Sequence, residues 1–233
     1  MDNNCRINTK ISVIIVAGGS GNRMGANIPK QFLILGDKPI LMHTIERFYE
    51  AIPSAELILV MSSTEFDRWE TLCKKYTFEI PHKTTCGGST RFSSVKNGIN
   101  AASLDSEIIM IHDGVRPFID KTTIFNTLGA LPKTGAVIPA INLVDSIREE
   151  KESGIYKVAD RTKFKLIQTP QVFYSEIIRK SYNRNDNALF TDDATVAEYS
   201  GYEITLCEGN SNNIKITSPI DLAIGNVILK HIH

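Results

Sequence analysis

A glycine-rich segment with two cations lies near the start of the chain. Residues 13–17 form an uncharged apolar run, glycines follow at 18, 19 and 21, and Arg23 and Lys30 stand seven positions apart. Glycines allow the backbone to turn tightly, and their N–H groups then form a concave site for an anion. The two cations add full charge where phosphates would lie. The segment predicts a phosphate-binding loop, although a strand-to-helix turn with two solvated cations has the same composition.

Two common phosphate-binding motifs do not fit this segment. The dinucleotide-binding pattern G-x-G-x-x-G would require a glycine where Met24 stands, and no clear acidic residue follows about 20 positions later. The P-loop requires Gly-Lys-Ser or Gly-Lys-Thr, and neither occurs in the chain. Both motifs are therefore excluded.

A second glycine turn, at residues 86–98, opens another helical pattern. Ser89 or Thr90 is the expected N-cap, and the N–H groups at such a helix start favour an anion or a base carbonyl. An ordinary capped helix would show the same residues, so this segment gains meaning only beside the first loop.

Asp113 directly follows an apolar run and is the candidate metal-binding residue. Open parallel sheets bind ligands at the carboxyl ends of their strands, and Mg²⁺ that carries nucleotide phosphates often takes only one or two protein carboxylates. The alternative is that Asp113 caps the next turn and pairs with Arg116.

The elements that must position these residues follow from apolar periodicity. Four buried strands are expected at residues 13–17, 56–61, 107–111 and 135–140, and helices at about 39–48 and 64–76. Pro170 places residues 166–173 at a sheet edge or in a loop. Thr191 is the expected N-cap of a helix that starts at 192, residues 212–217 predict a short strand, and Ser218 and Pro219 begin the last helix.

Residues 141–165 differ from the rest of the chain. They are polar and charged, and a turn at 153–154 separates two short runs, which predicts a protruding β-hairpin. A hairpin alone in water is marginally stable, so it is expected to pack on something, and a second subunit is a natural partner.

Composition bounds the remaining possibilities. A chain of 233 residues suits one α/β domain, spanning 1–233, and Lys+Arg equals Asp+Glu at 26, which gives no reason to expect nucleic acid or an anionic membrane as partner. The four cysteines lack metal-binding spacing, and residues 1–10 are polar, unlike a secretory signal. No stretch is apolar enough for a membrane span. We therefore expect a cytoplasmic protein.

Seven segments in the same order resemble the 2-C-methyl-D-erythritol 4-phosphate cytidylyltransferase family, from about residue 11 to 222. They are Ala-Gly-Gly-Ser-Gly-Asn-Arg-Met at 17–24, Pro-Lys-Gln at 29–31, Gly-Gly-Ser-Thr-Arg at 87–91 with Ser-Val at 94–95, His-Asp-Gly-Val-Arg-Pro at 112–117, Gln-Thr-Pro-Gln at 168–171 with Phe173, Thr-Asp-Asp-Ala at 191–194, and Asn-Ile-Lys-Ile-Thr at 213–217. Each segment is weak alone, and together they are specific. The resemblance departs at Ser89, where family members often carry an acidic residue, and at Gly114 and Val115, where alanines are commoner.

The resemblance implies a doubly wound, mostly parallel α/β fold that transfers CMP from CTP to a sugar-alcohol phosphate. It implies Mg²⁺ as cofactor, and a homodimer in which the β-arm at about 141–165 of each subunit helps to build the partner's site. Arg23, Lys30 and Lys215 would be catalytic. Nucleotide-binding residues would be Ala17, Gly18, Gly19, Gly88, Ser89, Ser94, Asp113 and Gly114, and acceptor-binding residues would be Arg116, Ser146, Arg161, Thr169 and Thr191.

Two alternatives stay open on the sequence alone. A sister family with nearly the same motifs uses ribitol 5-phosphate as acceptor, although the residues around Ser146 and Arg161 look more like the methylerythritol enzymes. A nucleotide-binding module without chemistry would share the fold, but it need not retain Lys30, Asp113 and Lys215 together.

Overall fold

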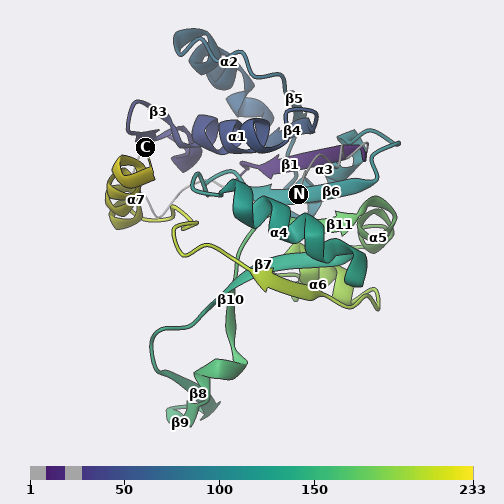
Figure 1. The fold of residues 1–233 in the computed structure, drawn as a ribbon, viewed down its shortest axis with the longest axis vertical. Helices are drawn as coiled ribbons and strands as arrows, with labels where there is room; N and C mark the ends of the chain where they lie inside the picture. Colours follow the sequence, from purple (N-terminus) through teal and green to yellow (C-terminus); the bar gives the residue numbers. More distant parts are fainter. Residues whose placement is uncertain (1–8, 19–27, 233) are drawn as a thin grey trace, which may run out of the picture.

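The computed structural model describes residues 9–18 and 28–232 of the chain. Its main sheet is built from β1 (Ile11–Val16), β4 (Glu56–Met61), β5 (Lys83–Cys86), β6 (Ile108–Asp113), β7 (Ala136–Asn142), β10 (Lys165–Ile167), β11 (Gln171–Tyr174) and β12 (Thr205–Glu208). The order is β10-β7-β11-β6-β1-β4-β5, and β12 pairs with β7 (Figure 1). Strands β6, β1, β4 and β5 are parallel, β11 is antiparallel to both of its neighbours, and β12 is parallel to β7. The predicted mostly parallel sheet is confirmed.

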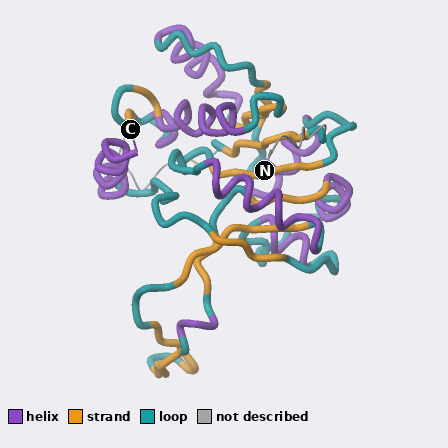
Figure 2. The backbone as a smooth tube through the Cα atoms, in the orientation of Figure 1, coloured by secondary structure: helices purple, strands orange, loops and turns teal. Residues whose placement is uncertain are grey.

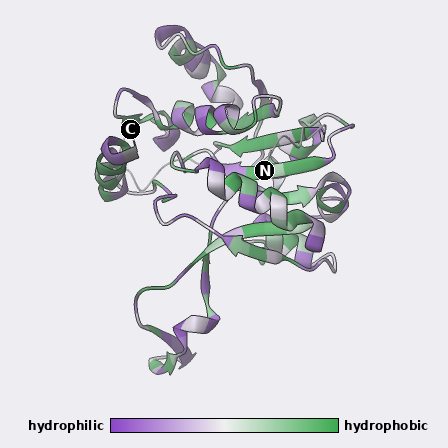
Figure 3. Cartoon of the chain, in the orientation of Figure 1, coloured by the Kyte–Doolittle hydropathy of each residue, from purple (hydrophilic) through white to green (hydrophobic). Residues whose placement is uncertain are grey.

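Helices cover both faces of this sheet. One face packs against α1 (Ile40–Ala51), α2 (Phe66–Lys75) and α4 (Lys121–Ala130), and the other against α3 (Arg91–Ala101), α5 (Ser175–Ser181) and α6 (Asp193–Glu198). Alternation along the strands produces the two layers, because Val13 and Ile15 belong to the first core cluster and Ile14 to the second. In Figure 3 the strands of the sheet are accordingly mostly hydrophobic. The fold is doubly wound, as expected.

Short elements complete the chain. They are the β2 (Ile34–Leu35) and β3 (Lys38–Pro39) pair, the 3₁₀ turns η2 (Lys30–Phe32), η3 (Ser63–Glu65), η4 (Leu131–Lys133) and η5 (Arg161–Lys163), and the last helix α7 (Pro219–Ile232). A third core cluster includes Leu35, Ile40 and Ile216, and apolar side chains of α7 pack against it. In the described part of the chain, no helix is both long and apolar enough to cross a bilayer.

The prediction for residues 166–173 is partly wrong. Residues 171–173 belong to β11, which lies inside the sheet between β6 and β7 rather than at an edge. Pro170 is tolerated because it falls in an interruption of the ladder: Ile167 pairs with Ala140 and Val172 with Val137, so extra residues bulge out between them.

Two other local predictions are also corrected. Residues 212–217 form no strand, because their backbone groups bond to separate partners, as Ile216 N–H does to the Val115 carbonyl. The N-cap of α6 is Asp192 rather than Thr191, since the Asp192 carboxylate accepts from the Thr195 N–H.

The predicted hairpin is present and protrudes. Strands β8 (Ile147–Glu152) and β9 (Ile155–Ala159) pair antiparallel around Gly154, whose φ is +81°. Figures 1 and 2 show this pair at the tip of an arm that extends away from the main sheet.

Candidate active site

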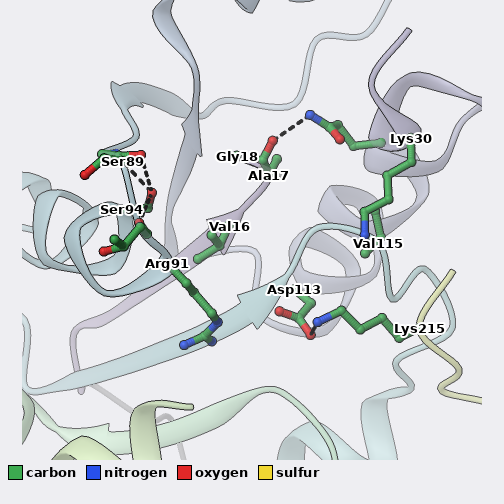
Figure 4. A pocket seen from close by; sticks show the side chains of 13 residues that line it. Val16, Ala17, Gly18, Lys30, Ser89, Arg91, Ser94, Asp113, Val115 and Lys215 are labelled. Atoms are coloured by element: carbon green, nitrogen blue, oxygen red, sulfur yellow. Dashed lines mark hydrogen bonds and ion pairs between the residues drawn. The ribbon is translucent and has the colours of Figure 1, made fainter. Parts of the chain in front are cut away.

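A cavity of about 440 Å³ opens at the carboxyl ends of β1 and β6. These parallel neighbours end side by side, because Val16 is paired with Asp113. Segments far apart in the sequence close the cavity (Figure 4). The lining residues are Val16, Ala17, Gly18, Lys30, Gln31, Gly88, Ser89, Thr90, Arg91, Ser94, Asp113, Val115 and Lys215.

The turn η2 holds Lys30 against the end of β1. Its central residue, Gln31, is buried, and Gln31 Nε2 donates to the Ala17 carbonyl at 2.6 Å. This bond fixes the backbone where the glycine segment begins. Since Lys30 precedes Gln31, the same contact places the base of the lysine side chain at the cavity wall.

The start of α3 forms the opposite wall. Thr90 is the N-cap, in a capping box with Ser93, which settles the choice between Ser89 and Thr90. The Ser94 hydroxyl donates to the Thr90 carbonyl at 2.8 Å and accepts from the Gly88 N–H at 3.0 Å. A Cβ on Gly88 would lie 2.2 Å from Ser93 Oγ, so this turn requires glycine. The wall is therefore a preformed backbone surface.

Asp113 is the acidic centre of the cavity. Lys215 Nζ lies 3.0 Å from Asp113 Oδ2, and Arg116 Nε lies 3.3 Å from the same oxygen. Burial opposes ionisation of Asp113, but the nearby charges of Lys215, Arg91 and Arg116 hold its pKa well below its usual range. Asp113 therefore lies at the end of β6, as predicted, and it also pairs with Arg116, as the alternative expected.

A chain of hydrogen bonds fixes the backbone at Asp113. The Asp113 N–H donates to Thr169 Oγ1 at 3.1 Å, and Thr169 Oγ1 lies 3.0 Å from His112 Nδ1. His112 Nε2 lies 3.1 Å from the Arg116 carbonyl, an acceptor only, which assigns the proton to Nε2 and makes the Thr169 hydroxyl the donor to Nδ1. Burial lowers the pKa of His112 to about 4, in keeping with this neutral tautomer.

The cavity brings together the predicted catalytic residues Lys30 and Lys215 and six of the predicted nucleotide-binding residues: Ala17, Gly18, Gly88, Ser89, Ser94 and Asp113. Gly114, Arg116 and Thr169 do not line it. Gly114 and Thr169 are buried, and Arg116 bonds to Asp113 and to the Asn213 carbonyl.

The other predicted residues lie further away. Thr191 is exposed just before α6, and Ser146 and Arg161 are exposed on the arm, where Arg161 donates to the Val144 carbonyl. Gly19 and Arg23 lie outside the described residues.

Arg91 was missed by the sequence analysis. It is the first residue of α3 and lines the cavity on the side of Asp113 opposite Lys215 (Figure 4). Its guanidinium forms a bidentate pair with the fully buried Asp193, with bonds of 2.8 and 2.7 Å, and Tyr182 also donates to Asp193. The position of Arg91 in the cavity depends on its contact with Asp193, which lies 102 positions away along the chain.

Asp113 is the one carboxylate that lines the cavity in the described part of the chain. Arg116 and Lys215 both approach its Oδ2. A single carboxylate suits Mg²⁺, which often takes one or two protein carboxylates and its other ligands from phosphates and water. Among the described residues, no group of three or more His, Cys, Asp or Glu side chains could hold a metal ion.

Comparisons with known proteins agree on one family. The family model described as 2-C-methyl-D-erythritol 4-phosphate cytidylyltransferase matches residues 11–231. Relatives with that name from Bacteroides thetaiotaomicron and Azobacteroides pseudotrichonymphae are 44% and 46% identical; the alignments cover 94% and 93% of this chain and 100% and 97% of theirs.

Solved structures give the same result. The 4-diphosphocytidyl-2C-methyl-D-erythritol synthase of Anaerococcus prevotii has a TM-score of 0.81 at 28% identity and covers 95% of this chain and 99% of its own. The cytidylyltransferase of Thermus thermophilus has a TM-score of 0.74 at 27% identity, over 95% and 100%. The chain belongs to the 2-C-methyl-D-erythritol 4-phosphate cytidylyltransferase family.

Proposed function

We propose that this chain transfers the CMP group of CTP to the phosphate of 2-C-methyl-D-erythritol 4-phosphate and releases pyrophosphate. The family match and the named relatives support this reaction, and they lend no support to ribitol 5-phosphate as acceptor. The observation that carries the proposal at residue level is the meeting of Lys30, Lys215 and Asp113 in one cavity.

The acceptor phosphate attacks the α-phosphorus of CTP in line with the leaving pyrophosphate. A phosphate monoester has a second pKa of about 6 and is largely ionised at neutral pH, so no strong general base is needed. The task of the protein is to bring two anions together and to stabilise the charge on the pentacoordinate phosphorus. Lys30 and Lys215, with Arg23, perform that task as catalytic residues.

Backbone groups at the glycine turns read the cytosine. Ala17 and Gly18 lie at the end of β1, and Gly88, Ser89 and Ser94 form the opposite wall. Gly19, which lies outside the described residues, is proposed to contribute with them. Support comes from the rigidity of the two walls, because Gln31 anchors Ala17 and Ser94 anchors Gly88. Asp113 and Gly114 are also proposed to contact the nucleotide.

Mg²⁺ is the proposed cofactor, with Asp113 as its protein ligand. When bound, it neutralises phosphate charge and holds the triphosphate in a reactive shape. Asp113 is suited to this because its low pKa keeps the carboxylate ionised at any physiological pH.

The arm at about 141–165 is the proposed homodimer contact of a single cytoplasmic nucleotidyltransferase domain. Exposure of large apolar side chains to water is unfavourable, and a cluster of them often marks a protein–protein contact. Such side chains lie on and beside the arm, with these exposed fractions: Val144 82%, Val158 80%, Tyr156 56%, Ile155 51% and Leu166 51%. Across this dimer Ser146 and Arg161 would reach the partner's acceptor, and Arg116, Thr169 and Thr191 would act from the same subunit.

Pyrophosphate release tests the reaction. The protein is mixed with CTP, MgCl₂ and one acceptor at a time, either 2-C-methyl-D-erythritol 4-phosphate or ribitol 5-phosphate. We expect release with the first only, and ATP, GTP and UTP to replace CTP poorly. Equal or faster release with ribitol 5-phosphate would refute the acceptor, and no release with either would refute the activity.

A further inference from the structure

The segment that carries Lys215 has no regular structure of its own. Residues 209–218 connect β12 to α7 without a helix or strand, yet Lys215 must meet Asp113 at the end of β6. A long, half-exposed lysine on a loop loses side-chain freedom when it is held in one place. Something outside the loop must therefore fix its backbone.

Two anchors bracket Lys215. On one side the Ile216 N–H donates to the Val115 carbonyl at 2.9 Å, and the Ile216 side chain is fully buried. On the other side Asn213 is also fully buried, and its Nδ2 donates to the Thr169 carbonyl at 2.9 Å. The Asn213 carbonyl in turn accepts from Arg116 Nη1 at 2.8 Å.

Gln168 holds the beginning of the same loop. Its buried amide donates to the Asn210 carbonyl at 2.8 Å and accepts from the Asn210 N–H at 3.1 Å. The approach is close, since a Cβ on Gly209 would lie 2.6 Å from Gln168 Oε1. Gln168 and Asn213 thus attach both parts of the loop to the segment around Thr169.

Thr169 connects this attachment to the other half of the ion pair. Its hydroxyl accepts from the Asp113 N–H and its carbonyl accepts from Asn213 Nδ2. Thr169 therefore contacts both the backbone of Asp113 and, through Asn213, the loop that carries Lys215.

In the described part of the chain, only the Nδ2 group of the Asn213 side chain forms a hydrogen bond. Its Oδ1 is buried without a hydrogen-bond partner in the described part of the chain, and such an acceptor costs free energy. An apolar side chain of the same shape would remove that unpaired oxygen, but it would also leave the Thr169 carbonyl without this donor. What only Asn213 supplies is the donor to Thr169.

We propose that Asn213 and Gln168 are positioning residues. They attach the loop that carries Lys215 to the segment around Thr169, and so hold Lys215 next to Asp113. The inference rests on the proposed catalytic role of Lys215. Neither side chain lines the cavity. They act on the reaction only through the loop.

A double-mutant cycle on the full-length protein tests this inference. Asn213→Leu keeps the shape of the side chain and removes the donor, and we expect it to lower kcat roughly tenfold to a hundredfold in the otherwise unchanged enzyme. In a Lys215→Ala background the same substitution should change kcat less than about threefold, because the lysine that it displaces is already gone. Gln168→Met should behave in the same way, and it serves if Asn213→Leu does not fold.

Ser181→Ala is the matched control. Ser181 is fully buried on α5 and donates to the Ile177 carbonyl at 2.8 Å, so its loss should lower the melting temperature and leave kcat unchanged. Equal losses of kcat from Asn213→Leu in both backgrounds, or no loss in either, would overturn the positioning role. Near-normal turnover of Lys215→Ala itself would instead overturn the proposed catalytic role, and the inference with it.

Discussion

At the scale of single residues, the cavity is a balance of fixed charges. Lys30, Arg91 and Lys215 are cations at its wall, and Asp113 is the acid among them. Arg91 is bound to Asp193 and Lys215 to Asp113, so most of this charge is already held in place. A reaction between two phosphate-bearing substrates gains most from charges that need no rearrangement.

Lys30→Ala should lower kcat about a hundredfold, which corresponds to a loss of about 3 kcal/mol of transition-state stabilisation. The reason is that the ammonium group is proposed to stabilise charge on the transferring phosphorus. Steady-state pyrophosphate release measures the effect. Lys133→Ala, on a turn outside the cavity, is the control and should retain normal turnover. Near-normal kcat of a folded Lys30→Ala protein would contradict the role.

At the scale of elements, the arm is the part of the chain that the monomer explains least. Within the described residues its two strands form a sheet of their own, and its large apolar side chains are exposed. A two-stranded hairpin is marginal alone, so the arm needs a surface to lie on.

Val158→Asp should convert the protein to monomers, because it places a charge in the middle of the proposed contact. Sedimentation velocity at micromolar concentration measures this, and we expect activity to fall with the dimer fraction, since Ser146 and Arg161 would no longer reach the partner. Glu149→Gln, on the exposed neighbouring strand of the hairpin, is the control. A wild-type monomer with full activity would remove the basis for the arm's role.

Elements with a local cause were predictable from the sequence, and those with distant causes were not. The strand at 56–61 and the hairpin turn at Gly154 follow from apolar runs and turn residues within a few positions. The loop at 212–217 was predicted as a strand because apolar and polar residues alternate along it, as they do in a strand with one buried face. Its conformation is decided elsewhere, by Arg116 and Val115.

The candidate site divides in the same way. The glycine turns and Asp113 could be placed from sequence because strand ends mark the ligand-binding edge of a parallel sheet. Arg91 could not, since its orientation depends on Asp193, and the buried hydrogen bonds of Thr169 could not be anticipated from its motif.

At the scale of the whole molecule, buried histidines link stability to pH. Burial lowers the pKa of His112 to about 4 from 6.5, and burial also lowers the pKa of His43. Between these values the unfolded chain binds a proton that the native state does not, so the free energy of unfolding decreases as pH falls from 6.5 towards 4. The His112 contribution is about 3 kcal/mol at most.

Urea denaturation at several pH values between 7 and 4 checks this expectation. His112→Gln should flatten the dependence of unfolding free energy on pH, and substitution of the exposed His231 by Gln is the control. The low pKa of Asp113 adds a further loss only below its ordinary value of 3.8, outside this window. A wild-type protein equally stable at pH 6.5 and 4.5 would contradict the assignment of a neutral, buried His112.

The contact of Lys215 with Asp113 also has a consequence for the protein when no substrate is near. Lys30, Arg91 and Lys215 are positive groups in one cavity, and like charges at short range repel one another. Without a negative charge among them, this repulsion would destabilise the folded protein. Here the negative charge of Asp113 offsets the positive charge of Lys215. The protein can therefore fold without a bound anion at this site. If the proposed roles hold, binding would be an exchange of partners, in which a substrate phosphate would take Lys215 and Mg²⁺ would take Asp113 from the ion pair that already exists.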